Sequence, residues 1–171
     1  MMRLQTTRLV LRDMSETDLP NLREILTDPV AMAAYEGPFD DSESQAWLDR
    51  NLQRYDEDGF GLWAVELRDA PGRMIGQCGI TRQRLEDDDI LEVGYLFHRA
   101  HWHRGFATEA ATASRDWAFR QLDAATIWAK VRDTNVASMN VAIRLGMTVR
   151  RRFLTHYRGA DMPHLGFAVD R

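Results

Sequence analysis

With 171 residues, 44% hydrophobic and 28% charged, the chain has the composition of one globular domain over residues 1–171, and its net charge of −4 disfavours nucleic acid as a partner. Its one cysteine, Cys78, excludes an internal disulfide and favours a reducing compartment. No apolar stretch approaches the roughly 20 residues that span a bilayer, and the N-terminus lacks a signal-peptide core, so we expect a cytoplasmic protein with no membrane partner.

The first predicted elements are a strand and two helices. Residues 8–14 alternate polar and apolar side chains, which is the period of a half-buried strand. Ser15 and Asp18 form an imperfect capping box ahead of a helix that carries leucine and isoleucine on one face. A second helix is predicted over residues 42–55, with Trp47 on its inner side.

Three consecutive strands come next. They are predicted over residues 60–69, 73–84 and 90–98, with turns at residues 70–72 and 86–89. Because short turns favour antiparallel neighbours, we expect a meander here.

The second half of the chain alternates helices and strands. An alanine-rich helix is predicted over residues 105–121, a strand over 125–133, and a helix over 134–146 that Gly146 closes. Two strands at 147–158 and 163–170 end the chain, and the polar turn at 157–163 is long enough to close over a pocket. The strand-helix-strand passage can place a parallel pair, so the sequence predicts a mixed sheet with helices on its faces.

The alanine-rich helix begins at a glycine within HWHRGFATEAA, residues 101–111. The first N–H groups of a helix have no partner, and a glycine there lets an anion approach them. A P-loop would need Gly-Lys-Ser/Thr, and a dinucleotide fingerprint would need two more glycines; both are absent. On these residues alone, two interpretations stay open. The segment is either the pyrophosphate loop of a coenzyme A acyltransferase or a plain helix start in which Gly105 serves packing.

The segment WHRGFATEA resembles the motif Trp-Gly-x-Gly-Tyr/Phe-Ala-Thr-Glu-Ala of GNAT N-acetyltransferases, in the branch that acetylates the N-termini of ribosomal proteins. His103 stands where that motif has its first glycine. Three more segments resemble the same branch in the same order: Thr-x-Arg-Leu-x-Leu-Arg at residues 6–12, the central strand LEVGYLF, and the Asn-x-x-Ser helix, where Met147 replaces an aromatic residue. The resemblance implies an α+β GNAT fold, with a mixed, mostly antiparallel sheet of about seven strands, helices on both faces and splayed central strands.

The resemblance implies acetyl-CoA as co-substrate, with its pantetheine arm lying in the splay like an added strand. The side-chain amide of Asn135 is expected to meet the pantetheine, and Ser138 is expected near the sulfur. Arg104 is either a direct phosphate contact or a solvated side chain. Histidine tolerates the left-handed backbone better than branched residues do, so the loop should keep its shape at His103. Backbone contacts are implied for the pantetheine at Leu96, Phe97 and His98, and for the pyrophosphate at His103, Arg104, Gly105, Ala107 and Thr108.

Acetyl transfer to a primary amine needs a group that removes the amine proton and a donor for the leaving thiolate. Many relatives use a tyrosine on the last helix as this donor, but the equivalent position, counted from Asn135, is Ala142. The branch that this chain resembles also lacks the tyrosine and uses the serine instead, so the resemblance implies Ser138 as the donor to the sulfur. Glu92 on the central strand is the predicted base, acting through water, and an ordinary strand glutamate paired with an arginine is the alternative.

The amine acceptor is open between a protein N-terminus, a free amino acid, a polyamine and an aminoglycoside, and the resemblance leans toward a protein or peptide α-amine. Its pocket is expected between the first two helices, the loop at residues 35–39 and the last hairpin. His98, His101 and His103 fit no common zinc spacing, so no metal is expected. A non-catalytic acyl-CoA sensor or interaction module on the same fold is the main alternative, an unrelated phosphate-binding α/β protein is a second, and a homodimer stays open.

Overall fold

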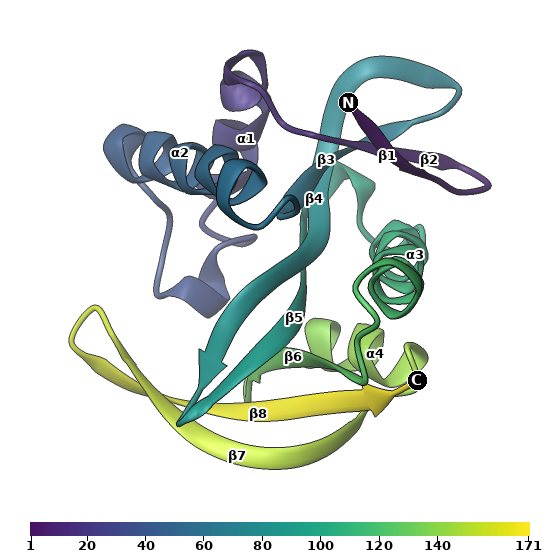
Figure 1. The fold of residues 1–171 in the computed structure, drawn as a ribbon. Helices are drawn as coiled ribbons and strands as arrows, with labels where there is room; N and C mark the ends of the chain where they lie inside the picture. Colours follow the sequence, from purple (N-terminus) through teal and green to yellow (C-terminus); the bar gives the residue numbers. More distant parts are fainter.

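The computed structural model describes residues 1–171 and contains one sheet of eight strands, with helices on both of its faces (Figure 1). The strands are β1 (Met2–Gln5), β2 (Leu9–Arg12), β3 (Leu62–Leu67), β4 (Ala70–Leu85), β5 (Asp88–Phe97), β6 (Thr126–Arg132), β7 (Thr148–Tyr157) and β8 (Ala160–Asp170). The helices are α1 (Leu19–Leu26), α2 (Asp41–Glu57), α3 (Phe106–Gln121) and α4 (Val136–Arg144), with short 3-10 turns η1 (Glu16–Asp18), η2 (Ala33–Tyr35) and η3 (Arg99–His101).

The strand order is β1-β2-β3-β4-β5-β6-β8-β7, and only the β5–β6 pair is parallel. The mixed, mostly antiparallel α+β fold is therefore confirmed, with one strand more than the sequence predicted. The additional strand, β1, has four residues, which are too few to show a polar–apolar period, and it exists because it pairs with β2.

Three predicted turns differ from expectation. The turn predicted at residues 86–89 takes only Glu86 and Asp87, because residues 88–89 already belong to β5. The first hairpin of the meander turns at Arg68 and Asp69, so residues 70–72 already belong to β4. The last hairpin turns at Arg158 and Gly159, both with positive φ, and β7 and β8 run up to them. The predicted long polar turn at residues 157–163 was wrong: most of it is strand.

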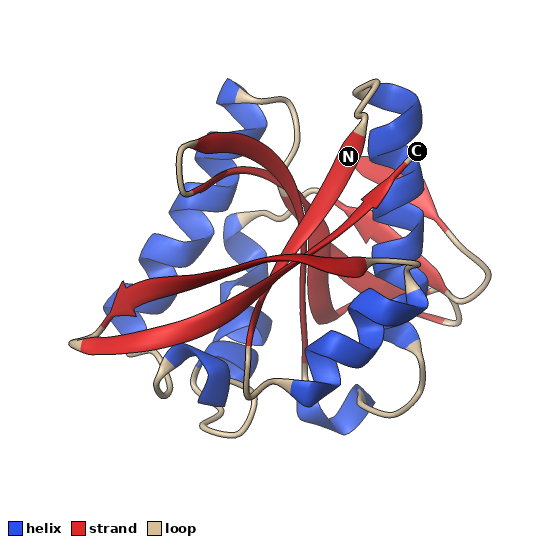
Figure 2. Cartoon of the chain, turned by 90° about the horizontal axis from the view of Figure 1, so that it is seen from below, coloured by secondary structure: helices blue, strands red, loops and turns tan.

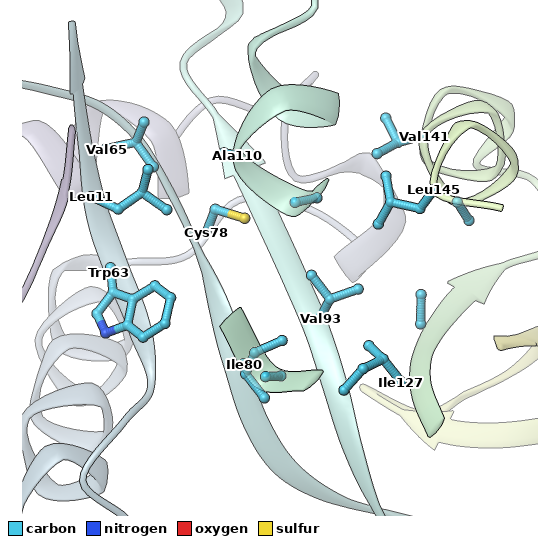
Figure 3. Close-up of a cluster of buried hydrophobic side chains, with 14 of the residues drawn as sticks. Leu11, Trp63, Val65, Cys78, Ile80, Val93, Ala110, Ile127, Val141 and Leu145 are labelled. Atoms are coloured by element: carbon cyan, nitrogen blue, oxygen red, sulfur yellow. The ribbon is translucent and has the colours of Figure 1, made fainter. Parts of the chain in front are cut away.

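The helices form a layer on each side of the sheet (Figures 1 and 2): α1 and α2 cover one face, and α3 and α4 the other. The core on the α3 and α4 face is the larger; it includes Trp63, Val93 and Leu145 (Figure 3). A second core under α1 and α2 includes Leu22 and Leu48. None of the helices has the length and apolar character needed to cross a membrane.

The sheet opens between its two central strands. β4 and β5 pair continuously from Gly76 opposite Phe97 to Leu85 opposite Asp88. β5 and β6 share only one pairing position, Glu92 opposite Trp128, and then separate. The predicted splay is therefore present, and it begins at Glu92.

Candidate active site

The backbone of β5 beyond Glu92 faces an open gap. His98 N–H donates to Ile75 O at 2.9 Å, on the β4 side, and Phe97 lies opposite Gly76. Backbone amides alternate between the two sides of an antiparallel strand, so Phe97 turns its own N–H toward β6. The sequence selected Leu96, Phe97 and His98 as backbone contacts. Of these three, Phe97 is the one whose N–H points into the gap.

The same alternation turns the Leu96 amide toward β4, as it does for His98, and turns the Tyr95 amide toward the gap. The carbonyl of Phe97 accepts a hydrogen bond from Trp102 Nε1 at 2.8 Å. The amide groups at the open edge are thus those of Tyr95 and Phe97, and sequence reasoning did not select Tyr95 because it had no register for the strand.

At the end of this gap lies the head of α3. Gly105 is its N-cap residue, with φ of 79°, and His103 is also left-handed, with φ of 59°. The first N–H to bond back into the helix is that of Glu109, which donates to Gly105 O at 3.0 Å. The N–H groups of residues 103–108 have no acceptor within the protein. They include all five that were predicted to bind the pyrophosphate: those of His103, Arg104, Gly105, Ala107 and Thr108.

A groove of about 860 Å³ runs beside this helix head, and Gly105, His103 and Thr108 line it. The guanidinium of Arg104 lies 4.8 Å from the ring centroid of Phe106 and forms no salt bridge. Its charge is therefore held at the helix head and is not neutralised. An elongated anion would find unpaired donors along this groove.

Glu109, the glutamate of the helix motif, holds the helix head in place. Its carboxylate accepts from Thr6 Oγ1 at 2.6 Å and from Arg8 N at 2.9 Å, and it pairs with Arg8 Nε at 2.7 Å. Burial opposes its ionisation, but these hydrogen bonds outweigh burial and lower the pKa of Glu109. The motif glutamate thus fixes the turn between β1 and β2 against α3.

Asn135 and Ser138 lie on the far side of the gap, at the start of α4. Asn135 caps the helix by accepting from Ser138 N at 3.1 Å, which leaves its amide nitrogen free to donate. Ser138 Oγ donates to the Tyr95 hydroxyl at 3.0 Å, and that hydroxyl donates to Ser138 O at 2.9 Å. Burial raises the pKa of Tyr95, so its hydroxyl stays protonated.

Glu92 sits at the point where β5 and β6 part. The Lys130 N–H of β6 donates to Glu92 Oε1 at 3.1 Å, and Lys130 Nζ lies 3.5 Å from Glu92 Oε2. The Glu92 carboxylate therefore accepts the hydrogen bond of a β6 amide that no longer pairs with the backbone of β5. Burial raises the pKa of Glu92, while Lys130 opposes this in part. A buried carboxylate with a raised pKa has the property of a general base.

Glu92 and the hydrogen-bonded pair of Tyr95 and Ser138 lie on opposite faces of the sheet. Side chains alternate along β5, so Tyr95 packs with the α3 and α4 core, whereas Leu96 packs with the α1 and α2 core. Glu92 shares the Leu96 face. A cavity of about 580 Å³ joins both sides, and Glu92, Tyr95 and Ser138 are all among its lining residues. The gap is therefore a passage through the sheet.

The side of this cavity that faces α1 and α2 is largely aromatic. Tyr35, Phe39 and Trp47 meet edge to face, with ring centroids 5.7–6.2 Å apart. Burial and the nearby Glu92 charge raise the pKa of Tyr35 to about 12. Tyr157 of the last hairpin completes this part of the lining, which thus comes from the segments expected to hold the acceptor.

The histidines near the helix head are not gathered around a common point. The rings of His98 and His101 are 6.1 Å apart, and His98 Nε2 lies 3.6 Å from Glu24 Oε2. No group of three or more histidine, cysteine, aspartate or glutamate side chains is placed to hold a metal ion.

A mixed sheet that opens between its central strands, beside a helix head with free N–H groups, defines an acetyltransferase of the GNAT class. Residues 8–148 match the acetyltransferase (GNAT) domain, and the chain belongs to this family. It is 36% identical over 146 residues to the uncharacterized protein YkkB of Bacillus subtilis, covering 85% of this chain and 84% of YkkB.

Solved structures agree with this assignment. An acetyltransferase from Agrobacterium tumefaciens is 31% identical, with a TM-score of 0.82 over 98% of this chain and 94% of that one. RimL, a ribosomal L7/L12 alpha-N-protein acetyltransferase solved in complex with coenzyme A, is 16% identical, with a TM-score of 0.78 over 99% and 98% of the two chains. The predicted resemblance to the ribosomal-protein acetyltransferases is thus confirmed as a likeness of fold.

Proposed function

We propose that the protein transfers the acetyl group of acetyl-CoA to a primary amine, by direct attack of the amine within a ternary complex. The observation that carries the proposal is the opening between β5 and β6, where one cavity is lined by Glu92, Tyr95 and Ser138, together with the free N–H groups at the head of α3, the helix that follows β5 in the chain. RimL, which has the same fold, was solved with coenzyme A, and this supports the choice of co-substrate.

On the coenzyme side, acetyl-CoA supplies the activated acetyl group as a thioester. The N–H groups at the head of α3 bind its pyrophosphate, and Arg104 adds a positive charge there. The open β5 edge at Tyr95 and Phe97 pairs with the pantetheine amides as a neighbouring strand would. The free amide nitrogen of Asn135 donates to the same arm.

On the acceptor side, Glu92 removes the proton from the attacking amine, directly or through one water. Its raised pKa brings its basicity closer to that of the amine than an exposed glutamate would have. A backbone N–H of the open β5 edge donates to the acetyl oxygen as charge develops on it. Ser138 Oγ donates its one proton to the Tyr95 hydroxyl in this structure, and it turns that proton to the sulfur as the thiolate leaves.

Direct attack is favoured over transfer through an enzyme thiol. Cys78 is fully buried, lies 3.6 Å from Ser114 Oγ, and lines neither the cavity nor the groove. Burial raises the pKa of its thiol to about 12, which leaves almost no thiolate at neutral pH. The single buried thiol also fits a reducing compartment, and a cytoplasmic location stays a prediction.

The test is an amine panel in which release of free coenzyme A from acetyl-CoA is measured. We expect amine-dependent release with intersecting double-reciprocal plots, as a ternary complex requires. Parallel plots would point to an acetyl-enzyme and contradict direct attack. Acetyl-CoA binding by calorimetry, with no release for any amine, would favour the non-catalytic sensor.

A further inference from the structure

The charge of the acceptor cavity is opposite to that of the whole chain. The chain has a net charge of −4. The cavity lining contains four cations, Arg50, Arg54, Lys130 and Arg132, against a single carboxylate, Glu92. A basic cavity in an acidic protein indicates a ligand that carries negative charge.

Two of these four cations already have partners. Lys130 pairs with Glu92, with 3.5 Å between Nζ and Oε2, and Arg132 pairs with Glu36. Arg50 and Arg54 form no salt bridge; the guanidinium of Arg54 has one hydrogen bond, to the Asn51 side chain. These two arginines stand one turn apart on α2 and therefore on one face of that helix.

Arg54 has no carboxylate within ion-pair distance. Burial lowers its pKa, and the neighbouring charge of Arg50 lowers it further. The more distant charges of Asp58 and Glu92 offset this lowering of the pKa only in part. A carboxylate bound between the two arginines would remove this repulsion and form charge-assisted hydrogen bonds with both.

A third donor in the same cavity also lacks an acceptor. Gln77 on β4 is fully buried and lines the cavity, and its Nε2 has no hydrogen-bond partner. Its amide orientation is fixed, because its Oε1 accepts from Trp47 Nε1 at 3.0 Å and an indole N–H only donates. The guanidinium of Arg50 lies 5.8 Å from the centroid of the same Trp47 ring.

These donors stand apart from the coenzyme phosphates. Arg50 and Arg54 belong to α2, whereas the residues of the proposed pyrophosphate groove belong mostly to α3. The two helices lie on opposite faces of the sheet (Figure 1). They share their face with Glu92, where the amine is expected. The unpaired charge therefore belongs to the acceptor.

We infer that the acceptor carries a carboxylate together with its primary amine, as an amino acid or a peptide does, and that Arg50 and Arg54 bind this carboxylate. The inference rests on the proposed function. The aromatic wall of Tyr35, Phe39 and Trp47 takes the carbon skeleton between the two charged ends. A polyamine or an aminoglycoside brings only positive charge to this cavity and is disfavoured.

The test compares acceptors that differ only in the negative charge. The first pair is Ser-Ala and Ser-Ala-amide, and the second is Ser-Asp-amide and Ser-Asn-amide; spermidine is the cationic reference. The first pair reports a terminal carboxylate and the second a side-chain carboxylate. We expect the charged member of at least one pair to have a kcat/KM roughly tenfold or more above its neutral partner, and spermidine to be poorer than both.

Arg50→Gln and Arg54→Gln should each bring this ratio close to one and leave the KM for acetyl-CoA unchanged. Arg150→Gln is the matched control: it also removes one positive charge, but Arg150 pairs with the exposed Asp170 and does not line the cavity, so the ratio should persist. A wild-type ratio of one in both pairs, or a ratio that survives in both α2 variants, would overturn the inference.

Calorimetric binding of the same acceptors separates this inference from the proposed function. A binding preference for the charged member that Arg50→Gln abolishes supports the carboxylate site, even if no coenzyme A is released. Release of coenzyme A with neutral acceptors and spermidine as efficient as the charged ones leaves the acetyltransferase proposal intact and refutes the carboxylate site.

Discussion

Replacing Glu92 by glutamine should change activity and stability in opposite directions. Glutamine keeps the size of the side chain and an oxygen that can still accept from Lys130 N–H, now 3.1 Å from Glu92 Oε1. It removes the negative charge and the ability to take a proton from the amine. We expect kcat to fall at least about 100-fold, equivalent to about 2.7 kcal/mol of activation free energy, with little change in the KM for acetyl-CoA.

The sign of the stability change follows from the raised pKa. A carboxyl whose pKa is higher in the folded protein stabilises it less as pH rises through that pKa, and its charged form is a net cost above it. At pH 8 glutamine avoids this cost. The lost ion pair with Lys130 is worth at most about 1 kcal/mol, since Lys130 Nζ keeps the Gln83 side chain at 3.4 Å and Arg84 O at 3.5 Å. The melting temperature at pH 8 should therefore stay equal to that of the wild type or rise.

Steady-state kinetics and scanning calorimetry at pH 8 check this together. Glu66→Gln is the control, because Glu66 is also a buried strand glutamate but binds Arg12 at 2.6 Å, away from the cavity. It should lower the free energy of unfolding by about 2 kcal/mol and leave kcat unchanged. If Glu92→Gln lowered the melting temperature and left turnover intact, Glu92 would be a structural residue and the assignment as base would fail.

Four further outcomes are expected around the helix head and the gap. Gly105→Ala should lower the free energy of unfolding by about 1 kcal/mol in urea titrations, because φ of 79° disfavours a Cβ. His103→Gly should change that free energy by no more than about 1 kcal/mol and leave the KM for acetyl-CoA unchanged, since only the left-handed backbone is needed; a large rise in KM would show that the imidazole itself binds. Glu109→Ala should cost about 1–2 kcal/mol at pH 7, and the difference from wild type should shrink as pH falls through the lowered pKa of Glu109, which unfolding measured across a series of decreasing pH values would reveal. Tyr95→Phe should lower kcat about tenfold at constant KM for the amine, because the Ser138 hydroxyl loses its partner; equal lowering in a Ser138→Ala background would contradict that coupling.

Local pattern was enough to predict most of the fold. The period of the strands and the glycines at Gly105 and Gly146 are properties of a few consecutive residues, and the structure has both glycines at positive φ next to α3 and α4. β1 could not be predicted in this way, because its four residues become a strand only through β2. The same holds for the last hairpin, where pairing of β7 with β8 extends both strands into a segment of turn-forming residues.

Only the part of the candidate site that lies within short sequence motifs could be predicted. Sequence motifs selected Ser138, Asn135 and Glu92, all of which line the cavity. They did not select Tyr95, because its partner Ser138 lies 43 positions away and on another element. Nor did they select Arg50 and Arg54 of α2, because whether an arginine lacks an ion-pair partner depends on which carboxylates lie nearby in space.

In the proposed mechanism, the pleat of β5 separates the base from the donor to the sulfur. Glu92 and Tyr95 are three positions apart on β5, so alternation sends their side chains to opposite faces, one to the acceptor cavity and one to α4. In the proposed mechanism the base, Glu92, therefore lies on one face, and the donor to the sulfur, Ser138, bonds to Tyr95 on the other. Burial raises the pKa of both Glu92 and Tyr95, but with opposite effects: it makes the carboxylate Glu92 a stronger base, and it keeps the hydroxyl of Tyr95 a donor. A strand that continued its pairing with β6 beyond Glu92 would close the passage between them, which is why the splay is as much a part of the chemistry as either side chain.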